Sequence, residues 1–500
     1  MKILWSDKQS SATIRGLATQ GVSASLARCI YASRLLGGQK DLVIHGGGNT
    51  SVKTSGYDLA QRKIDIMFVK ASGHELDGIG PEGFTCLDLD RLRKLESLDV
   101  LDEGQMGDVL SMARHDPRSP NPSVESLIHA FLPATYVFHT HANALLALTN
   151  QSNGRELTED LFGSDAIVLP YTMSGFSLAK RAIAAVKRSP DAKAVVVLKH
   201  GVFTFDDSAK EAYNMMTRLV TRARSRCKES HKQVFVTVDK IKKPMPIKEL
   251  APILRGSLLN SDKTCPGVIL DFRTNHVIRT FLEGKDLKRY ANAGPVTPDH
   301  VIWTKPKPLI ISSDGSSSAI RRELKKYTDA YIRYFDKNNV RFGGDRVIRE
   351  ALPRVILVPG MGLFGVGETS KAASIVADLA ETTVDVITAA EAIGRFCPVS
   401  SREIFDIEYW ALESAKLNNR VAPPLQGRVA VITGGGSGIG KATAHLFRKA
   451  GAEVVILDAR GKAAKEVAGN LGGLGLTVDI RDSALVRAAF NEVVLTYGGI

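Results

Sequence analysis

The spacing of hydrophobic positions in the first half of the chain alternates between helix-like and strand-like segments. Residues 22–37 have helical spacing and end at Gly37 and Gly38, a common helix stop signal. Further segments follow in alternation, with apolar runs of strand length at 64–70, 135–141 and 193–199 and helical spacing at 123–132 and 211–224. This mixture predicts an α/β fold up to about residue 245.

Two proline-containing segments, 242–246 and 422–424, are predicted to be linkers because proline breaks helices and favours extended chain. Five hundred residues also exceed the size of one ordinary core. We therefore expect an α/β multidomain protein divided into residues 1–245, a middle α/β region at 246–420, and residues 421–500. The middle region has a charged helical segment at 319–337, a strand at 354–358, and a glycine-rich loop at 359–367.

The last domain follows a different pattern. Strands are expected at 428–433, 453–457 and 475–479, with a glycine loop after the first strand and helices between the strands. Strands that alternate with helices in this way are typical of a doubly wound nucleotide-binding fold. We expect half of a Rossmann-type domain.

Composition narrows the class of protein. The chain is 44% hydrophobic and 24% charged, as in ordinary globular proteins, and its longest apolar runs are strand-sized. Five scattered cysteines without a Cys-x-x-Cys pair argue against disulfides and thiolate zinc sites, so we expect a cytoplasmic protein without a membrane span. The net charge of +13 fits either a solvated basic surface or attraction of anionic small molecules, and no nucleic-acid-binding motif accompanies it.

Three histidines form a candidate metal site. His139 and His141 are two residues apart on a predicted strand, so both imidazoles point to the same face. His200 ends another apolar strand. Three neutral imidazoles bind zinc or a similar ion and leave a coordination position open for substrate. The alternative is that they are polar residues at strand ends, and we expect the other histidines, including His129, to be structural or exposed.

Glu125 begins the helical segment at 123–132. It is either a first-turn acid that complements the helix dipole or a general acid/base beside the metal.

Four motifs in this order resemble the class II aldolase/adducin family, which includes sugar-phosphate aldolases and pentulose-phosphate 4-epimerases. They are His45-Gly46-Gly47-Gly48-Asn49, Asn121-Pro122-Ser123-Val124-Glu125, His139-Thr140-His141 and His200-Gly201. The resemblance implies a class II aldolase-type α/β/α domain, with zinc on His139, His141 and His200 and with Glu125 as the catalytic acid/base. It also implies a homo-oligomer that acts on a sugar phosphate.

The same resemblance implies that Gly48, Asn49, Ser72, Gly73 and Ser123 bind substrate, because glycine loops expose backbone N–H groups that suit a phosphate. An ordinary tight turn is the alternative. Val124 and Gly46 stand where the family's aldolases carry hydroxyl residues. Lys70 or Lys53 could compensate for the two missing donors, or the substrate could lack phosphate.

The segment 433–440, Thr-Gly-Gly-Gly-Ser-Gly-Ile-Gly, lies between a strand and a helix, where a backbone can approach a pyrophosphate. It resembles the short-chain dehydrogenase/reductase family, which implies NAD binding by Gly434, Gly438, Ile439, Gly440, Asp458 and Asp479. Asp458 ends the next strand, where an acid binds the ribose hydroxyls. No Tyr-x-x-x-Lys pair follows. We therefore expect an incomplete dehydrogenase module without activity, as in a fragment of a longer protein.

An aldolase followed by a dehydrogenase is similar to the bifunctional rhamnulose-1-phosphate aldolase/lactaldehyde dehydrogenase group, as are the segments 294–300 and 359–367. The resulting hypothesis is retro-aldol cleavage of a ketose 1-phosphate, such as rhamnulose 1-phosphate, to dihydroxyacetone phosphate and lactaldehyde. Two alternatives stay open: a pentulose-phosphate 4-epimerase and a non-catalytic adducin-like module.

Overall fold

The computed structural model describes residues 3–58, 60–229, 234–235, 244–261, 267–312, 315–414 and 422–500. The described residues form two compact units. Unit 1 comprises residues 1–234, 294–302 and 385–417, and unit 2 comprises residues 235–293, 303–384 and 418–500. Cys265 and the first residues of the predicted linker at 242–246 lie outside the described residues.

Unit 1 is built on a seven-stranded sheet in the order β3-β2-β1-β4-β7-β6-β5. All neighbouring strands are antiparallel except β5 and β6. The strands are β1 (Asn49–Tyr57), β2 (Lys63–Lys70), β3 (Phe84–Asp88), β4 (Tyr136–Thr140), β5 (Ile167–Leu169), β6 (Ala194–Val197) and β7 (Gly201–Asp206). The central position of β4 places His139 opposite Asn49 on β1 and opposite Phe203 on β7.

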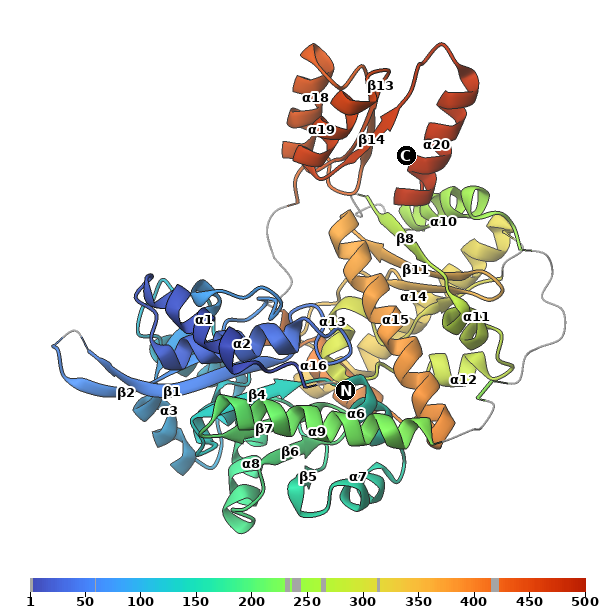
Figure 1. The fold of residues 1–500 in the computed structure, drawn as a ribbon. Coiled ribbons are helices and arrows are strands. Elements are labelled where there is room, and N and C mark those ends of the chain that lie inside the picture. The colour runs from blue at the N-terminus through green and yellow to red at the C-terminus, as the bar shows by residue number, and fades with distance from the viewer. Residues whose placement is uncertain are drawn as a thin grey trace. The chain divides into compact units, whose positions relative to one another are not determined.

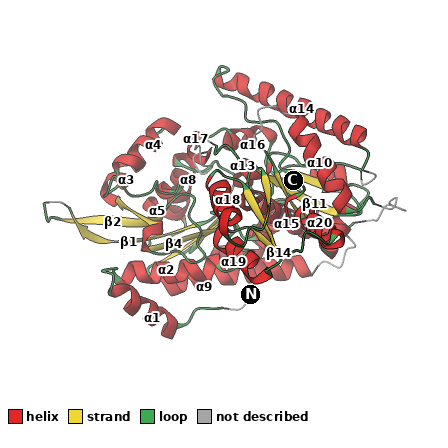
Figure 2. Ribbon diagram, turned by 90° about the horizontal axis from the view of Figure 1, so that it is seen from above, coloured by secondary structure: helices red, strands yellow, loops and turns green. Residues whose placement is uncertain are grey.

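Helices cover both faces of this sheet, as Figures 1 and 2 show. One face carries α1 (Asp7–Ala18), α2 (Ala24–Gly37), α6 (Asn143–Thr149), α7 (Gly154–Phe162) and α9 (Ala209–Lys228). The other carries α3 (Leu89–Lys94), α5 (Ser126–Phe131) and α8 (Phe176–Arg188). Unit 1 also contains α4 (Glu103–Met112) and the short 3₁₀ turns Pro81–Gly83, Leu95–Ser97 and Gly163–Asp165. The predicted α/β/α architecture is confirmed.

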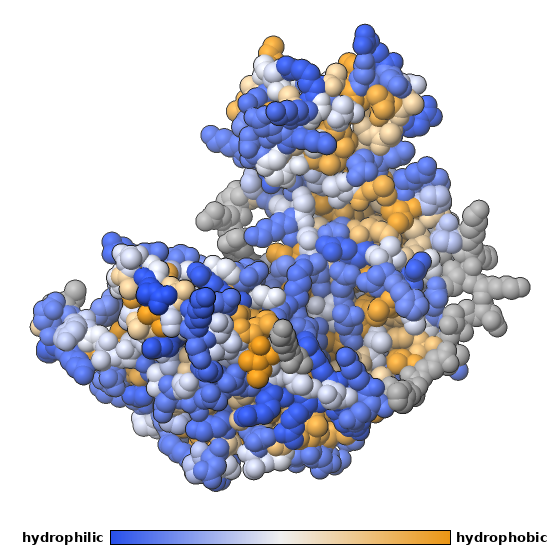
Figure 3. Space-filling model, viewed as in Figure 1, coloured by the Kyte–Doolittle hydropathy of each residue, from blue (hydrophilic) through white to orange (hydrophobic). Residues whose placement is uncertain are grey.

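The apolar positions that predicted these elements form the main core of unit 1. Residues of α2 and α9 meet Val52, Phe138 and Val202 of the central strands, and all three are fully buried. Hydrophilic residues cover most of the visible surface of this unit around α1 and α9 (Figure 3). Burial of one face of each helix therefore fixes the strands that carry the histidines.

Two segments of the middle region belong to unit 1. The first, residues 294–302, contains the 3₁₀ turn η4 (Pro298–His300), and the second contains α16 (Ser401–Glu408) and α17 (Ala411–Ser414). The turn η4 packs against α16. Asn150 donates a 2.8 Å hydrogen bond from Nδ2 to the carbonyl of Val296, and Gln151 donates a 2.9 Å bond from Nε2 to the carbonyl of Ala390. Buried amides directly after α6 thus anchor both segments.

Unit 2 contains a four-stranded sheet in the order β8-β11-β10-β9. Its strands are β8 (Ile269–Arg273), β9 (Leu309–Ile310), β10 (Val355–Val358) and β11 (Gly362–Gly367), with helices α10 (Ile247–Ser261), α11 (His276–Leu282), α12 (Leu287–Ala291) and α14 (Ser317–Asn339) and the 3₁₀ turn Val340–Phe342. The helices α13 (Val301–Thr304) and α15 (Ser370–Ile393) contain boundaries between the two units.

The glycine-rich segment 359–367 is mostly strand β11, so the expected loop was wrong beyond residue 361. Val358 of β10 pairs with Gly362, which leaves a three-residue turn between the two strands. A Cβ atom on Gly365 or Gly367 would lie 2.3 or 2.2 Å from backbone atoms of Ala373 in α15. These glycines therefore serve close packing of a helix on a strand.

The C-terminal part of unit 2 is a parallel three-stranded sheet in the order β12-β13-β14. It comprises β12 (Val429–Thr433), α18 (Gly438–Lys449), β13 (Glu453–Asp458), α19 (Gly461–Leu471), β14 (Leu474–Thr477) and α20 (Ser483–Tyr497). The predicted partial Rossmann-type region is confirmed. Among the described helices of the whole chain, none combines the length and apolar character that crossing a membrane requires.

Candidate active site

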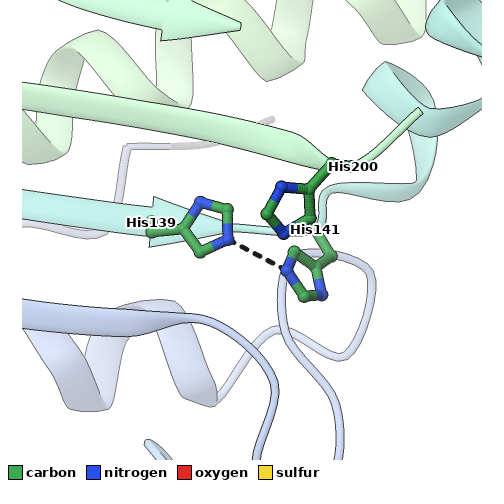
Figure 4. A group of neighbouring side chains, drawn as sticks. All are labelled: His139, His141 and His200. Atoms are coloured by element: carbon green, nitrogen blue, oxygen red, sulfur yellow. Dashed lines mark hydrogen bonds between the residues drawn. The ribbon is translucent and has the colours of Figure 1, made fainter. Parts of the chain in front are cut away.

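Three histidines of unit 1 converge on one point, as the sequence predicted (Figure 4). His139 lies on β4, His141 follows directly after it, and His200 lies in the turn between β6 and β7. The Nε2 atoms of His139 and His141 are 2.9 Å apart, and one ligand atom from each of the three histidines lies within 4.8 Å of the others. All three side chains are buried.

His139 and His200 each direct ring nitrogens towards the point where the three histidines converge. His139 Nδ1 donates a 3.0 Å hydrogen bond to the carbonyl of Val202, which leaves the lone pair on Nε2, and the ring stacks on Phe203 at 4.0 Å. Both ring nitrogens of His200 are buried, and neither has a hydrogen-bond partner among the described residues. Buried nitrogens such as those of His200, which have no hydrogen-bond partner among the described residues, are typical of metal ligands.

Burial also keeps the His141 imidazole neutral. Desolvation holds the pKa of His141 well below its usual value, against the raising effect of the Asp299 carboxylate. Neutral imidazole is the form that binds metals. The set of three converging nitrogens therefore fits a divalent ion.

The turn that carries His200 depends on two unusual backbone positions. Lys199 has a φ of 62°, in the left-handed region, and its ammonium donates a 3.1 Å hydrogen bond to the carbonyl of Pro398. At Gly201, a Cβ atom would lie 2.5 Å from the carbonyl oxygen of Thr140 and 2.8 Å from His139 Cε1. Close approach of β7 to β4, which brings His200 beside His139, therefore requires glycine here.

Glu125 faces the histidines from the start of α5. It is the N-cap residue of that helix, yet its side chain makes no capping bond. Its Oε2 lies 3.3 Å from His139 Nε2 and its Oε1 lies 3.4 Å from His200 Nε2. Ser174 donates a 3.2 Å hydrogen bond to Oε1. The carboxylate thus points at the histidine cluster and not at the backbone N–H groups of the first helical turn.

A second network holds Glu125 and was missed by the sequence analysis. Asn49 donates from Nδ2 to Glu125 Oε2 at 2.6 Å and to Ser123 Oγ at 3.1 Å, while its Oδ1 accepts a hydrogen bond from His129 Nε2. His129 Nδ1 lies 2.7 Å from Ser51 Oγ. Burial lowers the pKa of His129 to about 3, so this ring is neutral. The position of His129 four residues after Glu125 on the same helix was the available signal.

One pocket brings together all five residues predicted to bind substrate, namely Gly48, Asn49, Ser72, Gly73 and Ser123. Glu125 and Lys70 also line it, and the ammonium of Lys70 donates to the carbonyls of Gly46 at 3.0 Å and His74 at 2.6 Å. Lys53 is not among the lining residues, since its ammonium binds the carbonyl of Ala134 at 2.6 Å. Of the two lysines considered from the sequence, Lys70 is the one beside the pocket.

Asp299 also lines this pocket, although its local sequence did not predict a role for it. It lies in η4, in a segment that the sequence pattern placed in the middle region. Its Oδ2 is 3.6 Å from His141 Nε2 and its Oδ1 is 4.0 Å from His200 Nε2. The resemblance of residues 294–300 to a known group was the only signal for it in the sequence.

The predicted nucleotide-binding residues form a separate cluster in unit 2. Gly434 and Gly438 have φ values of 64° and 52°, and a Cβ on Gly440 would lie 2.4 Å from the carbonyl of Gly434, so this tight loop requires glycines. Ile439 is 88% exposed in the first turn of α18.

The two acids of this cluster lie at the ends of β13 and β14. Asp458 accepts hydrogen bonds from the backbone N–H groups of Arg460 at 2.9 Å and Gly436 at 3.0 Å, which lower its pKa. Asp479 follows β14 and forms a 2.7 Å ion pair with Arg481. The loop, the helix N-terminus and Asp458 therefore have the arrangement that the sequence predicted, while Asp479 is turned to Arg481.

Comparison with known families identifies three regions of the chain. Residues 27–227 match the family described as class II aldolase and adducin N-terminal domain. Residues 246–417 match the family described as aldolase class II, second domain, and residues 428–500 match the short chain dehydrogenase family.

Individual relatives match different lengths of the chain. The chain is 30% identical over 495 residues to an uncharacterized oxidoreductase, YuxG, of Bacillus subtilis, and the match covers 94% of this chain and 70% of YuxG. It is 39% identical over 85 residues to (+)-borneol dehydrogenase 1 of Salvia officinalis, covering 17% of this chain and 33% of that enzyme. The chain thus spans about a third of the length of that dehydrogenase.

Solved structures are similar to the first part of the chain. The N-terminal class II aldolase domain of a conserved protein from Thermoplasma acidophilum is 36% identical, with a TM-score of 0.41, and the match covers 45% of this chain and 98% of that domain. The L-fuculose-1-phosphate aldolase from Thermus thermophilus is 19% identical, with a TM-score of 0.26, covering 40% of this chain and 93% of that enzyme.

Proposed function

We propose that this chain, which belongs to the family of class II aldolase proteins joined to a short-chain dehydrogenase domain, cleaves a ketose 1-phosphate by a metal-dependent retro-aldol reaction. Rhamnulose 1-phosphate is the proposed substrate, with dihydroxyacetone phosphate and lactaldehyde as products. The observation that carries the proposal is the convergence of three imidazole nitrogens and the Glu125 carboxylate beside a glycine-lined pocket.

The proposed division of labour follows from the contacts in the site. His139, His141 and His200 would hold a zinc or similar divalent ion, which as a Lewis acid stabilises the enediolate charge that carbon–carbon cleavage creates. Glu125 would take the substrate hydroxyl proton at Oε1, because Oε2 accepts a short 2.6 Å hydrogen bond from Asn49 whereas Oε1 accepts a longer 3.2 Å bond from Ser174. Breaking the carbon–carbon bond releases the aldehyde, and a proton returned to the enediolate gives dihydroxyacetone phosphate.

The pocket would bind the phosphate. The chain turns at Gly46, Gly48 and Gly73, whose φ angles are positive. These turns line the pocket together with Ser72 and Lys70. Backbone N–H groups of such turns and one nearby ammonium suit an anion. Ser123, which accepts the hydrogen bond from Asn49, completes the proposed substrate residues.

A 4-epimerase is the second candidate, because it uses the same bond cleavage and then re-forms the bond. A coupled assay for dihydroxyacetone phosphate separates the two: the aldolase releases it from a ketose 1-phosphate, whereas the epimerase yields only an isomeric sugar. An adducin-like scaffold needs neither the converging histidines nor Glu125. Purified protein that binds no metal and cleaves no ketose 1-phosphate would favour the scaffold. The decisive test is elemental analysis combined with a screen of ketose 1-phosphates.

Further proposals concern the domain division, the nucleotide site and the assembly of the chain. Residues 1–245, 246–420 and 421–500 are proposed as three domains, which the matched ranges 27–227, 246–417 and 428–500 support. The glycine loop and Asp458 are proposed to bind NAD. Asp479 is proposed to contact the adenine of NAD, for which its carboxylate would leave the ion pair with Arg481. A homo-oligomer in the cytoplasm is also proposed.

A further inference from the structure

The Asp299 side chain faces the histidine cluster from a segment far away in the sequence. Its two oxygens approach two different imidazoles, with Oδ2 at 3.6 Å from His141 Nε2 and Oδ1 at 4.0 Å from His200 Nε2. Glu125 approaches a different pair, His139 and His200. The two carboxylates together therefore contact all three histidines, and His200 lies next to both.

These separations fit ligands of one ion. Ligand atoms about 2.1 Å from a five-coordinate ion lie about 3.0 to 4.2 Å apart, depending on the angle between them. The contacts of Glu125 at 3.3 and 3.4 Å and those of Asp299 at 3.6 and 4.0 Å all fall in this range. The 2.9 Å separation of His139 Nε2 and His141 Nε2 lies just below this range.

The negative charge of the Glu125 and Asp299 carboxylates also favours a bound cation. The Glu125 and Asp299 side chains are 5% and 18% exposed, and both face imidazoles that are buried. Placing two carboxylates beside neutral rings in a poorly solvated site is costly unless a cation balances them. A divalent ion would balance both.

The backbone around Asp299 is held in place rather than lying loosely over the site. Asn150 fixes the carbonyl of Val296, Thr297 is fully buried, and Pro298 begins the 3₁₀ turn with its fixed φ. The turn packs against α16. Segment 294–302 is thus an ordered part of unit 1, and it places the Asp299 carboxylate beside the histidines.

We propose that Asp299 is a further ligand of the metal centre, in addition to His139, His141 and His200. The inference rests on the proposed metal dependence and deepens it. The metal centre would include a residue of the region that matches the second aldolase domain, 246–417, so residues 27–227 would not contain the whole centre.

The test compares Asp299→Asn with wild type in the full chain, using cobalt(II) and zinc as probes. The visible absorption of bound cobalt should change in Asp299→Asn, because one charged ligand is lost. The apparent dissociation constant for zinc, measured by chelator competition, should rise at least about 10-fold. Asp299→Glu keeps a carboxylate and should recover part of the affinity.

The matched control is Asp206→Asn, which makes the same chemical change at a 24%-exposed aspartate of unit 1 that pairs with Lys193 at 3.5 Å. It should leave the cobalt spectrum and zinc affinity unchanged. If wild type binds one zinc that His139→Ala removes, but Asp299→Asn matches wild type in spectrum and affinity, the Asp299 proposal is wrong and the metal-dependent function stands. If wild type binds no metal, both proposals fail.

Discussion

The amide of Asn49 donates a 2.6 Å hydrogen bond to the carboxylate of Glu125, while the other end of the same amide accepts from His129. Because the Glu125 carboxylate can only accept hydrogen bonds, the NH₂ group of Asn49 faces Glu125 and its oxygen faces His129, which donates through Nε2 as a neutral ring. Glu125 and His129 thus hold the two ends of one amide, which positions the proposed catalytic acid/base.

Asn49→Ala should therefore lower turnover by about 10-fold or more without removing the metal, since Glu125 keeps its carboxylate but loses the bond that orients it. KM should change less than kcat. Steady-state kinetics with elemental analysis checks this, and Asn214→Ala, at a half-buried position of α9 where Nδ2 donates to Glu211, is the control. A loss of metal equal to that of a histidine variant would show that Asn49 has a structural role.

His139→Ala should strip about one metal ion per chain, because two remaining imidazoles hold a divalent ion poorly. Elemental analysis after dialysis measures the stoichiometry. His445→Ala, at an exposed position of α18, should keep the wild-type value. Unchanged metal content in the His139 variant would rule out this site.

Glu125→Gln should keep the fold and most of the metal but lower turnover by roughly 100-fold or more, the usual effect of losing a general acid/base. The amide has nearly the same shape and retains an oxygen that can accept from Asn49. Near-normal turnover would assign the proton transfer to another residue.

Gly201→Ala should weaken zinc binding and destabilise the fold by roughly 1–3 kcal/mol, because the added Cβ would lie 2.5 Å from the Thr140 carbonyl. Gly256→Ala is a matched control: this helical glycine has open space around it, so alanine should be neutral or stabilising. Denaturant unfolding and chelator competition measure the two effects. Equal behaviour of the two variants would contradict the close packing of β7 on β4.

His129 should make stability depend on pH. Its pKa is about 3 in the folded chain, below its usual value of 6.5, so the unfolded chain binds a proton first and stability falls as pH decreases from about 6.5 towards 3. His129→Gln should flatten the slope of unfolding free energy by up to about 1.4 kcal/mol per pH unit in this window. Unfolding of metal-free protein at several pH values measures it, and parallel curves would show that His129 is not buried as a neutral ring.

Local sequence patterns predicted much of the proposed site. The two-residue period of a strand put His139 and His141 on one face, and the apolar run before His200 predicted a second strand beside them. Glycines at 434, 438 and 440 predicted a tight loop before a helix, because few other residues adopt those backbone angles. The membership of the class II aldolase and short-chain dehydrogenase families was also readable from these motifs.

Contacts between distant segments were decided only by the tertiary structure. The role of His129 depends on β1 bringing Asn49 between it and Glu125, and strand β11 depends on α15 packing against its glycines. Asp299 lies 158 residues after His141 in the chain, and its place beside the histidines depends on a buried amide at Asn150 and on packing against α16. The sequence determines which side chains are available and the face each takes on its own strand or helix, because those follow from local backbone geometry. Which of them meet across the fold is determined by burial of apolar faces and by long-range hydrogen bonds, which local periodicity does not encode.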